Sequence, residues 1–126
     1  MTAGNKHYRG TTAYARVFAE LRLAAEYRGV TTYQDLAAIM GLPQRGAYMG
    51  AETGHILGAI SEDEVNAGRP MLSAVAVSIK GMPGPGFFDW ARTLGRLPAG
   101  ADERAFWEKE RDAVYEAWKR PLPRAQ

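Results

Sequence analysis

Four side chains that can bind anions or move protons recur at helical spacing: Arg45, Tyr48, Glu52 and His55. Steps of three, four and three residues place them on one face of a helix. Such a face suits contacts with guanine or with phosphates in a DNA major groove. Glu52 argues against this use because phosphates repel a carboxylate, unless it accepts from a cytosine amino group. The alternative is a solvated polar face on a structural helix.

Glu52 and His55 offer a second chemistry, because residues three apart on a helix are neighbours. They are suited to acid–base catalysis or to part of a metal site. A metal site needs more ligands, and the other histidine, His7, lies in a polar N-terminal stretch. Ser73 lacks the Gly-x-Ser-x-Gly context of a nucleophile elbow, so we expect a small polar residue on a strand. We therefore expect no enzymatic activity, no cofactor and no metal.

Residues 81–86, Gly-Met-Pro-Gly-Pro-Gly, form a candidate ligand loop. The lysine-containing phosphate-loop pattern is missing, yet bare backbone lets a ligand approach closely. The aromatic side chains that follow would mark a protein-partner surface if they were exposed. Arg69 is a candidate clamp for an anion at this loop. The residues expected at this ligand or partner loop are Arg69, Ser73, Pro83, Gly84, Gly86 and Phe87.

The composition excludes several classes of site. The chain has 126 residues and no cysteine, so disulfides, zinc–thiolate centres and cysteine nucleophiles are excluded. Hydrophobic residues make up 46% and charged residues 24%, which is typical of one globular domain. No apolar run approaches the roughly 18 residues that span a membrane. We expect a cytoplasmic protein with no membrane partner.

The charge is only mildly basic, with a formal net value of +2. Residues 1–57 carry six Lys and Arg against four Asp and Glu, whereas residues 58–126 carry ten of each. The excess therefore lies in the half that contains Arg45 and Tyr48. Because dedicated DNA-binding proteins usually carry a denser basic patch, charge gives modest support for a nucleic-acid partner.

Helical periodicity predicts three successive helices. The first runs from Thr11 or Thr12, as N-cap, to a C-cap at Gly29, and the second covers 33–40 behind the cap Thr32. The third begins near 45–47 and extends to about Ile60, with Thr53 as a polar member of its apolar stripe. A short helix, a glycine turn and a longer helix make a helix-turn-helix over 30–61. Glycines recur there every fourth residue, which permits close packing against another element (Gly46, Gly50, Gly54 and Gly58).

The rest of the chain predicts a small β element and two more helices. Ser61 begins a separate helical turn, and 71–79 is the clearest strand, paired with either 29–31 or 82–86. Helical spacing returns over 87–94 and over 101–118. The expected fold is mainly α with a small β hairpin: a winged-helix-like helix-turn-helix core plus a C-terminal amphipathic helix. One domain, 11–118, is flanked by flexible segments 1–10 and 119–126.

Residues 28–37, Arg-Gly-Val-Thr-Thr-Tyr-Gln-Asp-Leu-Ala, resemble the opening of a known DNA-binding domain. In alkylguanine-DNA alkyltransferases and alkyltransferase-like proteins, a Gly-x-Val-x-Thr-Tyr-x-x-Ile-Ala stretch leads into a helix-turn-helix. The resemblance covers about residues 28–60, and Met49-Gly50 falls on a Val-Gly step of the family's recognition helix. It implies a winged-helix fold and a DNA-binding mode.

The chain departs from that family at its chemistry. The apolar run 71–79 lies roughly where the family has its active-site stretch, but Pro-Cys-His-Arg is replaced by Met-Leu-Ser-Ala-Val. The family's intercalating arginine falls on Ala47, with Arg45 nearby. Alkyl transfer to a cysteine is therefore impossible. The chain also contains the motif Gly-Arg-Pro-x-Leu-Ser, followed later by Pro-Gly-x-Gly-Phe-Phe. This combination is similar to segments of prokaryotic and phage proteins without assigned activity.

Two functions remain open at this point. The first is a non-enzymatic protein that binds double-stranded DNA through the helix at about 45–60 and the loop at about 80–86. The second is a protein-interaction or inhibitory module, phage- or defence-related, that uses the 82–90 loop and its aromatics; a homodimer through the last helix is a related alternative. The residues expected to contact nucleic acid are Arg28, Thr32, Tyr33, Arg45, Tyr48, His55 and Lys80.

Overall fold

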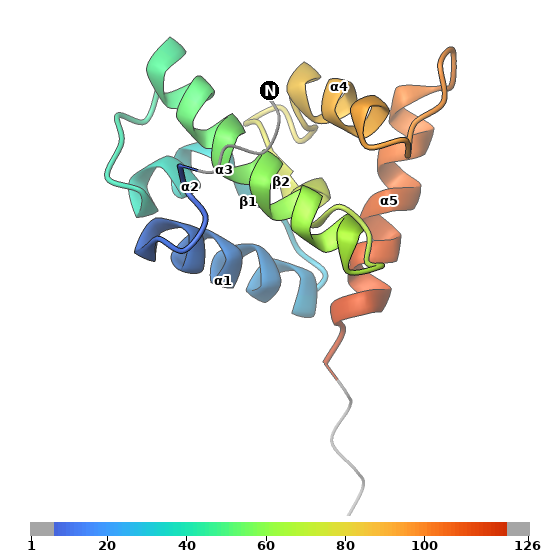
Figure 1. The fold of residues 1–126 in the computed structure, drawn as a ribbon, viewed down its shortest axis with the longest axis horizontal. Coiled ribbons are helices and arrows are strands. Elements are labelled where there is room, and N and C mark those ends of the chain that lie inside the picture. The colour runs from blue at the N-terminus through green and yellow to red at the C-terminus, as the bar shows by residue number, and fades with distance from the viewer. Residues whose placement is uncertain (1–6, 121–126) are drawn as a thin grey trace, which may run out of the picture.

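The computed structural model describes residues 7–120. In this range five α-helices enclose a short 3-10 helix and a two-stranded β element (Figure 1). The prediction of a mainly helical fold with a small β component is confirmed. No helix among residues 7–120 combines the length and the apolar character needed to cross a membrane. The elements are α1 (Thr12–Glu26), β1 (Thr31–Thr32), α2 (Tyr33–Ile39), α3 (Ala47–Asn66), η1 (Leu72–Val75), β2 (Ala76–Val77), α4 (Pro85–Thr93) and α5 (Glu103–Trp118).

The first two helices begin at the predicted caps. The Thr11 side chain accepts from the backbone N–H of Tyr14, and the Thr32 side chain accepts from that of Asp35. Each bond satisfies one of the N–H groups that a helix start leaves unpaired. Gly41 ends α2 with a φ of 74°, a left-handed conformation that suits glycine.

The third helix is longer than predicted and continues through Ser61 to Asn66. The expectation of a separate turn at Ser61 is therefore wrong. Ser61 and Glu64 are buried, at 0% and 2% exposure, so the inward stripe of α3 contains polar residues that broke the expected pattern. The helix ends only before Gly68, whose φ is 82°.

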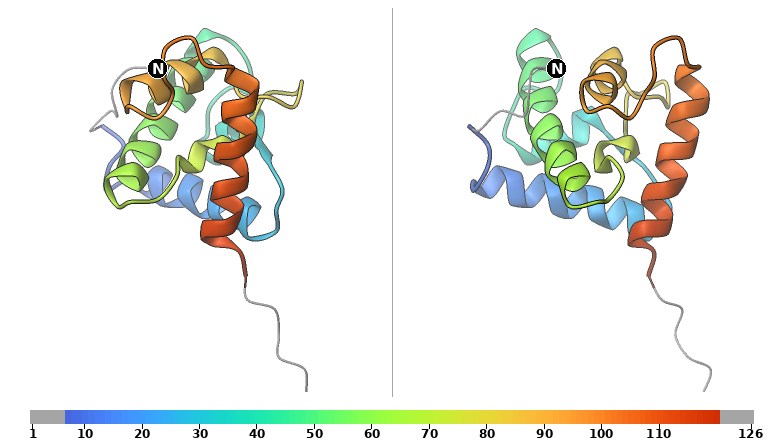
Figure 2. Two further views of the ribbon diagram at one scale, coloured as in Figure 1. Left: turned by 90° about the vertical axis from the view of Figure 1, so that its right-hand side faces the viewer. Right: turned by 45° about the vertical axis from the view of Figure 1, so that its right-hand side comes forward.

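The strand predicted over 71–79 is reduced to Ala76–Val77, and the preceding residues form η1. Thr31 pairs with Ala76 and Thr32 with Val77 in parallel, so the expected hairpin is wrong. Of the two predicted partners, the segment near 29–31 supplies the strand. Figure 2 shows η1 and β2 enclosed by α1, α3 and α5. Residues buried on every side show no alternation of polar and apolar types, and this pattern alone does not distinguish a strand from a helical turn.

The last helix packs on this centre as its apolar stripe predicts. Trp107 and Val114 are 4% and 0% exposed, and the indole N–H of Trp107 donates to the Ala74 carbonyl at 2.9 Å. Tyr115 donates to the Gly29 carbonyl at 2.8 Å. The aromatic side chains of α5 thus contact the core of the same chain.

Two expectations about the chain ends and turns are corrected. Arg28, rather than Gly29, takes the left-handed conformation after α1, with a φ of 55°. Residues 7–10 are packed and not loose: Tyr8 is 8% exposed, and Arg9 pairs with Glu62 and Asp63 on α3. The predictions for 1–6 and 121–126 lie outside the described residues.

Candidate functional site

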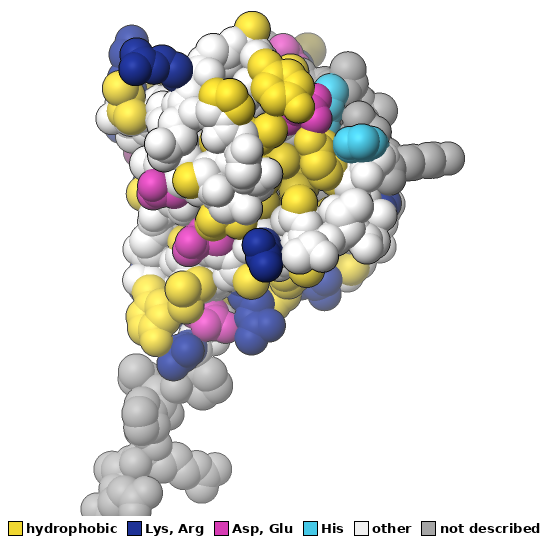
Figure 3. Space-filling model, turned by 90° about the vertical axis from the view of Figure 1, so that its left-hand side faces the viewer, with side chains coloured by type: hydrophobic (Ala, Val, Ile, Leu, Met, Phe, Trp, Pro, Cys, Tyr) yellow, Lys and Arg dark blue, Asp and Glu magenta, His cyan; other side chains and the backbone are white. Residues whose placement is uncertain are grey.

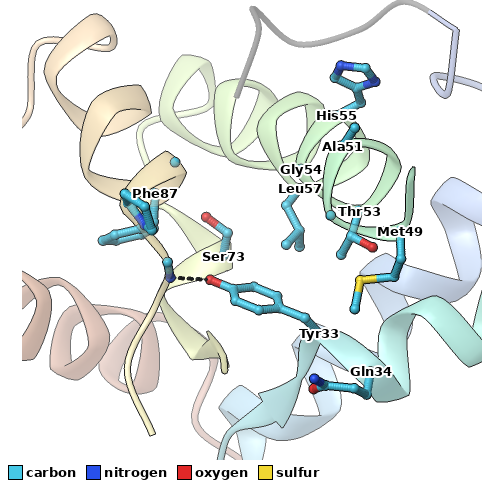
Figure 4. Close-up of a pocket in the computed structure, with 14 residues that line it drawn as sticks. Tyr33, Gln34, Met49, Ala51, Thr53, Gly54, His55, Leu57, Ser73 and Phe87 are labelled. Carbon is cyan, nitrogen blue, oxygen red and sulfur yellow. Dashed lines mark hydrogen bonds between the residues drawn. The ribbon is translucent and has the colours of Figure 1, made fainter. Parts of the chain in front are cut away.

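A pocket of about 520 Å³ lies between α2, the first half of α3 and the start of α4 (Figure 4). One wall is the N-terminal half of α3, and the other is the segment 84–87. Tyr33 and Gln34 approach from the start of α2, and Ser73 from η1. The lining residues are Tyr33, Gln34, Met49, Gly50, Ala51, Thr53, Gly54, His55, Leu57, Ser73, Gly84, Pro85, Gly86 and Phe87.

Tyr33 connects the two walls of the pocket. Its hydroxyl oxygen accepts a hydrogen bond of 2.8 Å from the backbone N–H of Gly84, the residue that precedes α4. Burial raises the pKa of the Tyr33 phenol, although the bond from Gly84 acts in the opposite direction. Phe87 is 3% exposed and packs edge-on against Phe88. The pocket therefore has two aromatic side chains in fixed positions.

Replacing Tyr33 by phenylalanine should weaken the attachment of the 84–87 segment. Tyr33→Phe leaves the Gly84 N–H without its acceptor, and we expect a loss of about 1–2 kcal/mol in the free energy of unfolding, measured by urea denaturation. Tyr48→Phe is the matched control, because Tyr48 is 62% exposed and should change stability by less than about 0.5 kcal/mol. Equal stability of the two variants would contradict this role of the Tyr33 hydroxyl.

Gly50 and Gly54 of α3 border the pocket and do not pack against another element. A side-chain carbon built at Gly50 or Gly54 meets no atom within 4 Å. The predicted close packing through the glycine strip is therefore wrong at these two positions. Their missing side chains leave open the space that ligand atoms would occupy.

Two buried side-chain oxygens of pocket residues have no hydrogen-bond partner in the part of the chain described: Gln34 Oε1 and Thr53 Oγ1. His55 Nδ1 also lacks a hydrogen bond, but it faces Glu52, and Figure 4 shows its ring directed away from the cavity. Buried polar groups are normally paired, so each unpaired one requires a reason. Thr53 is only 2% exposed, although its hydroxyl can both donate and accept. A ligand that donates hydrogen bonds at these positions would satisfy Gln34 Oε1 and Thr53 Oγ1.

Ser73 adds a hydroxyl to the pocket from η1, where a strand was expected. Its Oγ accepts from Ser61 Oγ at 2.7 Å, and its backbone N–H donates to Ser61 Oγ at 3.1 Å. The partner of Ser73 is thus another hydroxyl and not a base. In this arrangement the Ser73 proton is available to donate to a ligand.

Glu52 and His55 are neighbours, as their spacing predicts, with His55 Nδ1 lying 3.4 Å from Glu52 Oε2. The other oxygen of Glu52 accepts from the Tyr8 hydroxyl, and burial together with this bond raises the Tyr8 pKa. The Glu52 carboxylate therefore accepts one hydrogen bond, from Tyr8, and lies beside the His55 ring. No group of three or more potential metal-ligating side chains occurs among residues 7–120.

The cations predicted to bind nucleic acid differ in their surroundings. Arg45 and Lys80 are exposed and form no ion pair with any described carboxylate, whereas Arg28 lies at the far end of α1, near Tyr115 and Glu116. Figure 3 shows Lys and Arg side chains at separate places on the face of α2 and the start of α3, with hydrophobic surface beside the histidines. On this face the cations border an apolar area and do not merge into one patch.

The structure brings together some predicted residues and separates others. Those that line the pocket are Tyr33, His55, Ser73, Gly84, Gly86 and Phe87. Arg69 is not near the loop, because it pairs with Glu64 at 2.7 Å and stacks on Trp118. Pro83 is buried outside the pocket lining, and Thr32 is used as the α2 cap.

Sequence reasoning missed that Gln34, Met49 and Thr53 line the pocket. For Thr53 the sequence does carry a signal, because it is a polar residue within the apolar stripe of its helix. The expected aromatic partner surface is also corrected: Phe87, Phe88 and Trp90 are at most 5% exposed, because they belong to the core.

Comparisons with protein-family models, with curated proteins and with solved structures found no match for this chain.

Proposed function

We propose that this protein binds double-stranded nucleic acid without catalysing a reaction, and that its pocket holds one base removed from the stack. The start of α3 and the turn before α4 would contact the duplex, with Arg45 and Lys80 at phosphates. The observation that carries the proposal is the pocket between α2, α3 and α4, with two unpaired side-chain oxygens, Gln34 Oε1 and Thr53 Oγ1. The resemblance of residues 28–60 to an alkyltransferase DNA-binding domain points to the same partner.

The pocket suits a nucleobase in size and in chemistry. A volume of about 520 Å³ lies within the range of small-molecule sites and has room for a base with its sugar. Tyr33 and Phe87 provide aromatic surface for a planar ring, while Thr53, Gln34 and Ser73 provide hydrogen-bonding atoms. Proteins that read an extruded base use this combination of apolar stacking and contacts to its polar edge.

The pairing of charges supports the same surface. Arginines on α4 and α5 and in their connection pair with carboxylates: Arg92 with Glu103, Arg96 with Glu110 and Arg104 with Glu108. Arg45 and Lys80 lack such partners among the described residues. Unpaired exposed cations can neutralise phosphates and release condensed counterions, which is the main source of duplex affinity.

Salt dependence tests the nucleic-acid proposal. Affinity for a short duplex, measured by fluorescence anisotropy, should fall steeply with added salt. Arg45→Ala and Lys80→Ala should each reduce the slope of log K against log salt by about 1. Lys109→Ala is the matched control: Lys109 is exposed on α5, forms no ion pair among the described residues, and should leave the slope unchanged. Absence of duplex binding at low salt would overturn the proposal.

A further inference from the structure

No charged side chain lines the pocket among the residues that the structure describes. Its walls contain no Asp, Glu, Lys or Arg, and the His55 ring is directed away from the cavity (Figure 4). Burial raises the pKa of the Tyr33 phenol, which therefore stays neutral at neutral pH. A charged group such as phosphate would lose its hydration in this pocket without gaining a counter-ion. The pocket therefore suits a neutral group.

The unpaired polar atoms of Gln34 and Thr53 are both oxygens. Gln34 Oε1 comes from the start of α2 and Thr53 Oγ1 from α3, so the two walls each supply one (Figure 4). An amide oxygen only accepts hydrogen bonds, and a hydroxyl oxygen can accept while its proton is donated elsewhere. Ser73 Oγ already accepts from Ser61 Oγ, which leaves its own proton to donate. A matching occupant presents donors to two oxygens and an acceptor to Ser73.

We propose that the pocket selects bases that carry an exocyclic amino group, whose N–H donors bind Gln34 Oε1 and Thr53 Oγ1. Adenine, cytosine and guanine carry such a group, whereas thymine and uracil present carbonyl oxygens, which would face the two protein oxygens. A buried site built to accept from an amino group disfavours an analogue without one, because its own oxygens then stay unpaired. This inference rests on the proposed function and adds the class of base that the pocket takes.

Duplexes that differ by a single amino group test this selection. Adenine and purine are compared at one position opposite an abasic site, where neither base has a pairing partner to lose. Competition anisotropy should show about tenfold tighter binding of the adenine duplex, and the ratio should fall to about threefold or less in Gln34→Met and in Thr53→Val. Thr93→Val is the matched control and should keep the full ratio, because Thr93 is exposed on α4 and lies outside the pocket lining.

Urea denaturation distinguishes a lost contact from a damaged fold. Thr53→Val replaces an unpaired buried hydroxyl with a methyl group of similar shape, so the urea midpoint of the unbound protein should not fall. Equal affinity of the unaltered protein for the two duplexes would overturn the selection for an amino group, and so would a full ratio in both pocket variants. Failure to bind either duplex would instead remove the proposed function together with this inference.

Discussion

If the pocket holds an extruded base as proposed, the protein should prefer a mismatched duplex over a matched one, and Gly54→Phe should abolish that preference. A mispaired base costs less to extrude, so the unaltered protein should bind a duplex with one mismatch about tenfold more tightly. Gly54 lines the pocket, and a side-chain carbon added there meets no atom within 4 Å. A side chain added at Gly54 therefore starts in open space at the pocket, and we expect a phenylalanine ring to occupy part of the pocket and exclude the base.

The control is Gly54→Ala, which adds one carbon and leaves most of the pocket open. Alanine also replaces glycine inside a helix, so this variant should gain about 0.5–1 kcal/mol in stability. Competition anisotropy with both duplexes should show a retained preference for Gly54→Ala and equal affinities for Gly54→Phe. If Gly54→Phe still prefers the mismatch, the base does not occupy this pocket.

Glu110→Ala should destabilise the fold by about 3 kcal/mol or more. Glu110 is 5% exposed and connects three parts of the chain from α5. One carboxylate oxygen accepts from the backbone N–H of Met71 at 2.9 Å, and the other accepts from Arg96 Nη2 at 2.9 Å. Removal of the carboxylate would leave an arginine and a buried N–H without partners at the start of η1.

Urea denaturation of Glu110→Ala and Glu108→Ala compares a buried and an exposed carboxylate on the same helix. Glu108 pairs with Arg104 at 3.6 Å on the surface, and its loss should cost less than about 1 kcal/mol. Similar losses for the two variants would show that Glu110 does not hold η1 in place. Because η1 contributes Ser73 to the pocket, Glu110→Ala should also weaken binding to the mismatched duplex.

Local sequence signals predict most of the helical framework. Helix caps and helix ends depend on residues only a few positions apart, as at Thr11, Thr32 and Gly41. They can therefore be assigned without knowing the fold. The amphipathic stripe of α5 likewise predicts which face of the helix is buried, because the same helical spacing of apolar residues continues through all sixteen residues of the helix.

The central segment and the pocket could not be predicted in the same way. Residues 72–77 are buried by three helices, so their conformation depends on contacts from distant parts of the chain, such as Glu110 with Met71. The pocket joins Tyr33 to Gly84, which are 51 positions apart. Sequence placed Tyr33 and Ser73 among the candidate residues, but it could not show that they face the same space.

The most direct measurement uses a duplex in which 2-aminopurine is the mispaired base. The protein is titrated into this duplex at low salt, and anisotropy and 2-aminopurine fluorescence are recorded together. Extrusion of the base into the pocket relieves the quenching caused by stacking. We therefore expect both signals to rise and saturate at the same protein concentration. A rise in anisotropy without a change in 2-aminopurine fluorescence would contradict base capture, and a flat anisotropy would contradict nucleic-acid binding itself.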